Sequence, residues 1–179
     1  MTGRRDAPRI VSLLPSATEI VFALGLGDAL VGVTHECDWP PEARTKTVLT
    51  RATGRRIGAR SPRIHELVTA AVHGGTSRYR LDAAALGDAR PDLILTQELC
   101  PVCAVSYRRV TDVVRPIDAD VAVVSLEPSS LEGIFNTITT VGAMTSRERA
   151  ALRLVERLRS RLARVERKVQ RRRQGGRRP

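Results

Sequence analysis

Residues 9–43 read RIVSLLPSATEIVFALGLGDALVGVTHECDWPPEA, and this segment decides the fold class. It begins with a short β-branched run at residues 9–14, which predicts a buried strand. Ser16 and Glu19 have the spacing of a helix-capping box, and apolar residues then recur at helical spacing until a pair of glycines. Residues 29–34 form a second β-branched run. The segment therefore predicts a strand, a helix and a second strand, which together make one β–α–β unit.

The same alternation continues along the chain. Short apolar runs predict two more strands, at residues 93–96 and 121–126. Periodic segments predict further helices, which begin at Ser61, cover residues 81–89, follow Cys103, and start at two more capping boxes, Ser129 with Glu132 and Thr145 with Glu148. Residues 42–60 lack periodicity and are predicted to be a loop. Strands that alternate with helices predict an α/β fold with a parallel sheet and helices on both faces.

Composition limits the possible classes of protein. Of 179 residues, 42% are hydrophobic but only 3% are aromatic, so the core must consist mainly of aliphatic side chains. No run of eighteen apolar residues occurs, which argues against a transmembrane helix. Residues 1–145 contain 16 basic and 16 acidic residues, whereas residues 146–179 contain 14 and 3. The net charge of +11 therefore belongs to a C-terminal segment and not to the surface of a nucleic-acid-binding domain.

The first residues do not have the pattern of an export signal. Ser12, Pro15 and Glu19 interrupt the apolar stretch that follows Arg4 and Arg5, whereas a signal peptide carries an uninterrupted apolar segment. Three cysteines, an odd number, also argue against a disulfide framework. The sequence therefore predicts a cytoplasmic protein that does not insert into a membrane.

Residues 146–170 are predicted to form one long helix, followed by a disordered basic tail at residues 171–179. Apolar residues recur along this helix at alternating steps of four and three and form a narrow seam among arginines: Ala151, Val155, Leu158, Leu162, Val165 and Val169. Two interpretations of the seam stay open, namely packing along the edge of the domain, or a coiled coil with a partner or a second copy. The arginines of the tail would allow non-specific binding to nucleic acid or another polyanion.

Three segments in the same order resemble a known family. They are residues 9–43, quoted above, residues 91–106, PDLILTQELCPVCAVS, and residues 123–134, VVSLEPSSLEGI. Together they resemble the substrate-binding proteins of ABC importers for vitamin B12 and iron siderophores, and most of all the subgroup called cobalamin-binding proteins. The resemblance implies a helical-backbone periplasmic-binding-protein-like fold, in which a rigid helix joins two α/β lobes that hold the ligand between them. In this plan residues 8–145 are the first lobe, residues 146–170 are the connecting helix, and the second lobe is absent.

The resemblance also implies where the ligand binds. The loops after the first and second strands correspond to loops that face the ligand in this family, and open parallel sheets generally bind ligands at the carboxyl ends of their strands. The implied ligand is cobalamin, another corrinoid or a related metal complex. Because no nucleophile–base pair and no phosphate-binding glycine loop occurs in the sequence, we expect a binding module and not an enzyme. The candidate ligand-binding residues are Pro15, Ser16, Thr18, His35, Glu36, Trp39, Gln97 and Glu98.

Three residues near these loops have two interpretations each. His35 would ligate the cobalt of a corrin as a neutral imidazole, or would bond to a nearby backbone group or to Glu36. Trp39 would stack on a flat ligand, or would fill the space under its turn. Asp82 is the acidic residue nearest to the position at which importer-linked relatives dock on transporter arginines, but it is also placed to cap the helix that follows it.

The three cysteines predict a different kind of site. Cys100 and Cys103 form a Cys-x-x-Cys pair, and with Cys37 and His35 they would complete a structural zinc site if the loops of neighbouring strands approach each other. A redox-active thiol pair is a second interpretation. Ordinary packing of small apolar side chains is the third.

Overall fold

The computed structural model describes residues 8–52, 79–98, 107–115 and 120–174. Contacts divide the chain into two compact units, Met1–Glu127 and Pro128–Pro179. The domain boundary that the sequence suggests at residue 146 therefore falls inside the second unit. The helix predicted to start at Ser61 lies outside the described residues.

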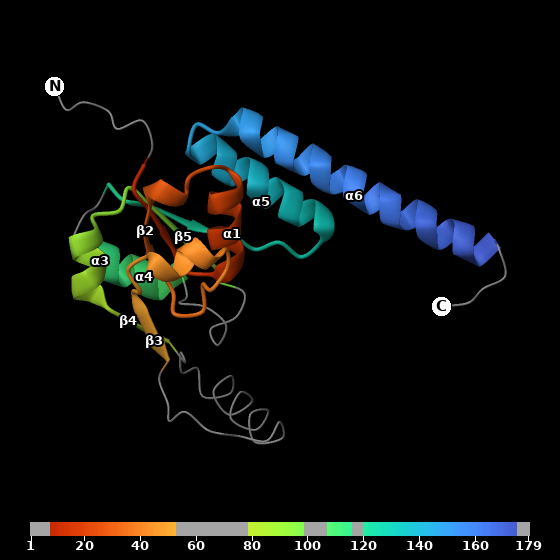
Figure 1. The fold of residues 1–179 in the computed structure, drawn as a ribbon. Coiled ribbons are helices and arrows are strands. Elements are labelled where there is room, and N and C mark those ends of the chain that lie inside the picture. The colour runs from red at the N-terminus through yellow and green to blue at the C-terminus, as the bar shows by residue number, and fades with distance from the viewer. Residues whose placement is uncertain (1–7, 53–78, 99–106, 116–119, 175–179) are drawn as a thin grey trace, which may run out of the picture. The chain divides into compact units, whose positions relative to one another are not determined.

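A four-stranded parallel sheet organises the first unit (Figure 1). Its strands are β1 (Ile10–Ser12), β2 (Leu30–Val33), β5 (Leu93–Thr96) and β6 (Ala122–Ser125), in the order β2-β1-β5-β6. The helices described in this unit are α1 (Pro15–Ala23), α3 (Ala83–Ala89) and α4 (Tyr107–Val114), and 3-10 turns occupy Gly27–Ala29 and Pro41–Thr45. The prediction of four parallel strands is confirmed, and β5 has the predicted limits.

Alternation of side chains along β1 places helices on both faces of the sheet. Val11 and Leu13 belong to a buried cluster with Leu86 of α3 and Val110 of α4. Ser12 points to the other face, where α1 lies against β1. Figure 1 shows the same arrangement, with α3 and α4 on one side of the strands and α1 on the other. The predicted α/β class, with helices on both faces, is confirmed.

The predicted loop over residues 42–60 contains a strand that the sequence analysis missed. β3 (Thr50–Ala52) pairs antiparallel with β4 (Tyr79–Leu81), and we call this pair the β3–β4 ribbon. A parallel bridge between Val33 and Val48 joins the segment just before β3 to the end of β2. Each strand of the ribbon has three residues and includes an arginine, so no apolar alternation marks it. Its pairing depends on residues far apart in the sequence, which local patterns do not report.

Helix caps are the second correction. α1 begins at Pro15 after Leu14, without a side-chain cap, so Ser16 lies inside the helix and the predicted capping box with Glu19 is wrong. The cap of α5 (Leu131–Met144) is Ser130, one residue after the predicted Ser129. Asp82 does cap α3, because its carboxylate accepts the Ala85 N–H at 3.1 Å.

The second unit is a pair of helices, α5 and α6 (Glu148–Gln174). Thr145 ends α5 and donates its hydroxyl to the Val141 carbonyl at 2.7 Å, so it does not form the predicted capping box for α6. At about 1.5 Å per residue, α6 is about 40 Å long and α5 about 21 Å, so the end of α6 extends beyond its partner. α6 also continues through Gln174, past the predicted end at residue 170.

The seam of α6 changes character along its length. Ala151 and Val155 are buried, and Ala151 packs so closely on α5 that a Cβ added to Gly142 would come within 2.5 Å of its Cβ. Val165 and Val169 are 53% and 43% exposed. The first half of the seam is therefore a helix-packing surface, and the second half is an apolar strip on a projecting basic helix.

Replacing Gly142 with valine should destabilise the second unit, because the new side chain overlaps a rigid methyl group and not a flexible chain end. We expect a loss of roughly 1–3 kcal/mol in the free energy of unfolding, measured by urea denaturation. The control is Thr140→Val, an exposed position on the same helix. Equal denaturation midpoints for the two variants would contradict the close approach of α5 and α6.

Candidate ligand-binding site

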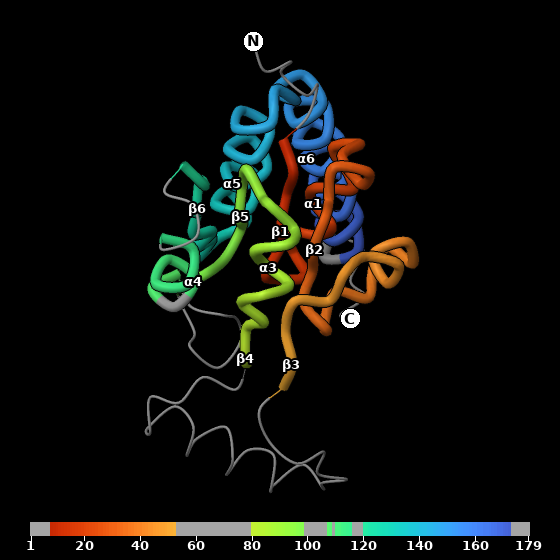
Figure 2. Tube along the Cα trace, turned by 90° about the vertical axis from the view of Figure 1, so that its left-hand side faces the viewer, coloured from red at the N-terminus to blue at the C-terminus, as the bar shows by residue number. Residues whose placement is uncertain are grey.

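Parallel pairing brings the predicted loops to one edge of the sheet. Ser12 of β1 is in register with Val33 of β2 and with Leu95 of β5. The residues that follow these three strands therefore emerge side by side at the carboxyl edge (Figure 2). This is the edge at which open α/β sheets bind their ligands.

Beneath this edge lies a buried cluster of hydroxyl groups around the Cys37 thiol. The Thr18 hydroxyl lies 2.9 Å from Ser12 Oγ and 3.1 Å from Cys37 Sγ, and the Thr34 hydroxyl lies 3.2 Å from the same sulfur. Cys37 is only 4% exposed, and Thr18 and Ser12 are fully buried. The cluster joins β1, α1 and the loop after β2, and so it holds that loop against the first helix. Thr18 thus occupies a supporting position below the surface.

His35 is fixed by a second buried hydroxyl. The Thr50 Oγ1 atom accepts the His35 backbone N–H at 3.2 Å and lies 2.8 Å from the ring nitrogen Nδ1. Thr50 is buried, whereas the imidazole is exposed at the end of β2. When Nδ1 carries the proton and donates it to Thr50, Nε2 is unprotonated, which is the form that binds metals. The ribbon therefore orients this imidazole.

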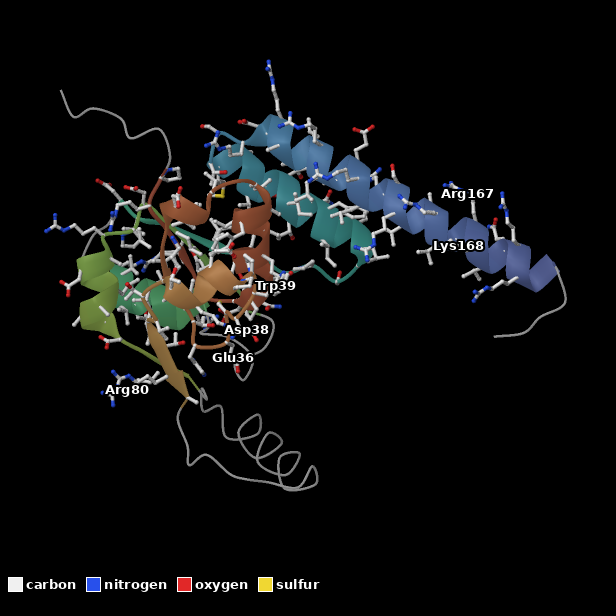
Figure 3. The ribbon with its side chains drawn as sticks, viewed as in Figure 1. Glu36, Asp38, Trp39, Arg80, Arg167 and Lys168 are labelled. Atoms are coloured by element: carbon white, nitrogen blue, oxygen red, sulfur yellow. The ribbon has the colours of Figure 1, made fainter. Side chains whose placement is uncertain are left out.

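The other candidate residues of the 34–39 loop, Glu36 and Trp39, do not lie together. Glu36 is exposed, and its backbone N–H donates to Thr34 Oγ1 at 3.2 Å. Trp39 is 61% exposed and lines a hollow of about 620 Å³ along α1, with Phe22 and Glu42 among the other lining residues. His35 and Glu36 do not line this hollow. Figure 3 shows Glu36, Asp38 and Trp39 following one another along the loop. The structure therefore separates Trp39 from the strand-end residues.

The other candidate ligand-binding residues follow β1 and β5 at the same edge of the sheet. Pro15 is the first residue of α1 and is half-buried, and Ser16 beside it is exposed. Gln97 and Glu98 follow β5 and are half-buried. The Glu98 carboxylate accepts the Arg108 backbone N–H at 3.4 Å, so it also binds the first turn of α4.

The proposed zinc site is not assembled from the part of the chain that the structure describes. Within those residues, no group of three or more His, Cys, Asp and Glu side chains is placed to hold a metal ion. Cys100 and Cys103 lie outside the described residues, so their pairing with Cys37 stays a prediction. The hydroxyl contacts of Cys37 account for its burial through packing of the loop.

The supporting residues Ser12, Thr34 and Thr50 were missed by the sequence analysis. Thr34 stands directly before the candidate residues His35 and Glu36, and its hydroxyl accepts the Glu36 N–H. Thr50 had no such signal, since it lies fifteen residues from His35 in the sequence and inside a predicted loop.

With this geometry established, comparison with known proteins identifies the class. The sequence matches the periplasmic binding protein family over residues 10–177, and the chain belongs to this family. It is 25% identical over 171 residues to the ABC transporter substrate-binding lipoprotein YvrC of Bacillus subtilis, covering 94% of this chain and 44% of that protein. A 37-residue stretch is 60% identical to the vitamin B12-binding protein of Vibrio cholerae, covering 21% of this chain and 13% of that protein.

Solved structures support the same fold. A periplasmic heme-binding protein from Pseudomonas aeruginosa superposes with a TM-score of 0.63 at 21% identity, covering 88% of this chain and 45% of that one. The chain spans less than half the length of these relatives. The family is one of substrate-binding proteins, which agrees with the expectation of a binding module. The names of these relatives refer to vitamin B12 and to heme.

Thr18→Val tests the buried hydroxyl cluster. Removing the hydroxyl takes a partner from Ser12 and from Cys37 inside the protein, so we expect the free energy of unfolding to fall by about 1–2 kcal/mol. Urea denaturation measures the change. Ser16→Ala, at an exposed position in the same turn, serves as the control and should change stability by less than about 0.5 kcal/mol. If both substitutions had the same small effect, the cluster would not hold the loop.

Proposed function

We propose that this protein binds a corrinoid or a related metal complex, such as heme, at the loops that follow β1, β2 and β5. The observation that carries the proposal is the exposed imidazole of His35 at a strand end, held by a buried threonine. Exposed Ser16 and Glu36 and half-buried Gln97 provide polar groups around it on the same edge. The family and the names of the relatives support the chemical class.

His35 supplies the interaction that a metal-containing ligand would need most. A neutral imidazole is a common ligand of cobalt and iron, and its affinity depends on orientation and on the group bonded to the other ring nitrogen. Thr50 meets both needs, because one oxygen contacts the ring and the backbone of the same residue. Glu36 and Gln97 would then contact the polar periphery of the ligand.

Binding is tested by titrating the purified protein with aquocobalamin and, separately, with hemin, and by recording the visible spectrum. Coordination by imidazole shifts the absorption bands of either ligand, so we expect a shift with wild-type protein and its loss in His35→Ala. His65→Ala and His73→Ala, the other two histidines, are the controls and should retain the shift.

The outcomes separate two claims. A shift that persists in His35→Ala would reject His35 as the metal ligand. If neither compound shifts its spectrum or co-elutes with the protein in gel filtration, the proposal of a tetrapyrrole-binding site is rejected.

The cellular compartment and the interaction with a transporter are also matters of proposal. The relatives are described as a lipoprotein and as periplasmic proteins, which argues against the cytoplasmic location expected from the sequence. Among the described residues no helix is both long and apolar enough to span a bilayer. The Asp82 carboxylate caps α3, which favours its capping role over docking on an importer.

A second candidate function concerns α6 alone. Its projecting half carries an exposed group of basic residues, of which Figure 3 labels Arg167 and Lys168: Arg161, Arg164, Arg167, Lys168, Arg171 and Arg172. Binding of a polyanion to this group would weaken steeply with salt. The same like charges surround Val165 and Val169 and oppose pairing of two copies through the seam.

This second candidate is tested by measuring binding to a duplex DNA probe between 50 and 200 mM salt, values chosen to span the range in which counterion release dominates. We expect binding that falls by more than tenfold over this range and that is lost in a variant with Arg164, Arg167 and Lys168 changed to glutamine. Binding that does not change with salt concentration, or that is retained after these substitutions, would exclude α6 as a polyanion site.

A further inference from the structure

Two arginines face each other across the β3–β4 ribbon. The antiparallel register pairs Arg51 of β3 directly with Arg80 of β4. The neighbouring pair, Thr50 and Leu81, is buried, so the two arginines point to the opposite face of the ribbon, and both are exposed. Figure 3 shows the Arg80 side chain projecting from the ribbon away from Trp39.

This pairing brings two like charges together. Directly opposite residues of an antiparallel pair have Cβ atoms about 4.5–5.5 Å apart, and like charges in this position destabilise the ribbon. None of the carboxylates in the described parts of the chain forms an ion pair with Arg51 or Arg80. The nearest acidic residue in sequence, Asp82, uses its side chain to accept the Ala85 N–H.

A hollow of about 340 Å³ lies at this pair. Its lining residues among those described are Arg51, Arg80, Leu81, Asp82 and Ala83. Guanidinium groups present fixed donor forks that match the oxygens of a carboxylate or a phosphate, and two forks on one face can bind a single oxyanion group together. The hollow has room for such a group with its hydration water.

The pair is also adjacent to the proposed binding site. Arg51 follows Thr50, the residue whose hydroxyl contacts His35, and the Val33–Val48 bridge joins the segment just before β3 to the end of β2. Arg51 is therefore the chain neighbour of the residue that contacts His35, although its side chain lies on the other face of the ribbon. The two arginines were not among the residues that sequence analysis selected, because β3 lies in a predicted loop and β4 was not predicted to be a strand.

We propose that Arg51 and Arg80 together bind an oxyanion group, a carboxylate or a phosphate, at the periphery of the bound ligand. The proposal rests on the proposed function, in which His35 contacts the metal centre of the same ligand. It assigns the ligand an acidic substituent: the carboxylates of a heme or the phosphodiester of a complete corrinoid. The bound anion would also cancel the repulsion between the two guanidinium groups.

Matched ligand pairs test this assignment. Affinities are measured for hemin and its dimethyl ester, and for cobalamin and cobinamide, which lacks the phosphodiester. In the variant Arg51→Gln/Arg80→Gln we expect affinity for the member that carries the carboxylates or the phosphodiester to fall by about 10- to 100-fold, and affinity for the member without that group to be unchanged. Arg44→Gln is the control, because Arg44 is an exposed arginine of the 41–45 turn near Asp38.

Thermal denaturation supplies a readout of folding. Removal of the like-charge pair should leave the ligand-free melting temperature unchanged or raise it, so a fall in affinity cannot be ascribed to unfolding. Added inorganic pyrophosphate should raise the melting temperature of the wild-type protein and of Arg44→Gln, and should have no effect on the double variant.

Each outcome decides between the two proposals. If wild type binds a tetrapyrrole and the double variant binds its acidic form equally well, the arginine pair is not an anion site, while the proposed function stands. If no tetrapyrrole binds but pyrophosphate stabilises wild type and not the double variant, the proposed function fails and the oxyanion site is retained. If pyrophosphate stabilises the wild-type protein and the double variant alike, the arginine pair is rejected.

Discussion

The parallel pairing of β1 with both β2 and β5 is the constraint on which the site depends. With β1 between them, the ends of three strands lie in one row, and loops that are far apart in sequence share one edge. A parallel sheet needs both faces covered, and α1 and the α3–α4 layer cover the two faces of β1. The candidate site therefore lies at the carboxyl edge of the sheet, where these loops meet.

Buried hydroxyl groups fix the loop that follows β2 at this edge. Cys37 and His35 sit on the same loop but are held by different partners, Cys37 by Thr18 and Thr34 inside the unit and His35 by Thr50 of the ribbon. The loop is thus fixed from two sides, one of them built from β1 and α1 and the other from β3. Such contacts from neighbouring elements orient ligating groups, and losing one typically costs about 10- to 100-fold in metal affinity.

How much of the fold and of the candidate site could be predicted depends on how far apart in the sequence the interacting residues lie. The strands of the main sheet and the long last helix were predicted because each has a strong local pattern, buried β-branched runs or a seam with helical spacing. The ribbon was missed because Thr50–Ala52 and Tyr79–Leu81 acquire their structure only by pairing with each other. The capping boxes failed because a Ser-x-x-Glu spacing does not identify the residue at which a helix starts; Pro15 begins α1 before Ser16 can cap it. For the site, strand-end residues such as His35 were predicted from topology, whereas the direction of Thr18 and the separation of Trp39 depend on packing.

The ribbon links the two kinds of recognition proposed for this protein. Thr50 and Arg51 are neighbours in one strand, so their side chains alternate: the first turns inward and holds His35, and the second turns outward beside Arg80. A single short strand therefore positions the imidazole that we propose as a metal ligand and half of the proposed oxyanion site. Coordination of a metal depends on an unprotonated nitrogen, whereas binding by guanidinium groups depends only on the charge of the ligand, so the two contributions respond differently to acid and to salt. A ligand with only a metal centre, or only an acidic group, would bind through one of the two contacts. A metal complex with acidic substituents would bind through both, and its higher affinity would make the protein selective for it.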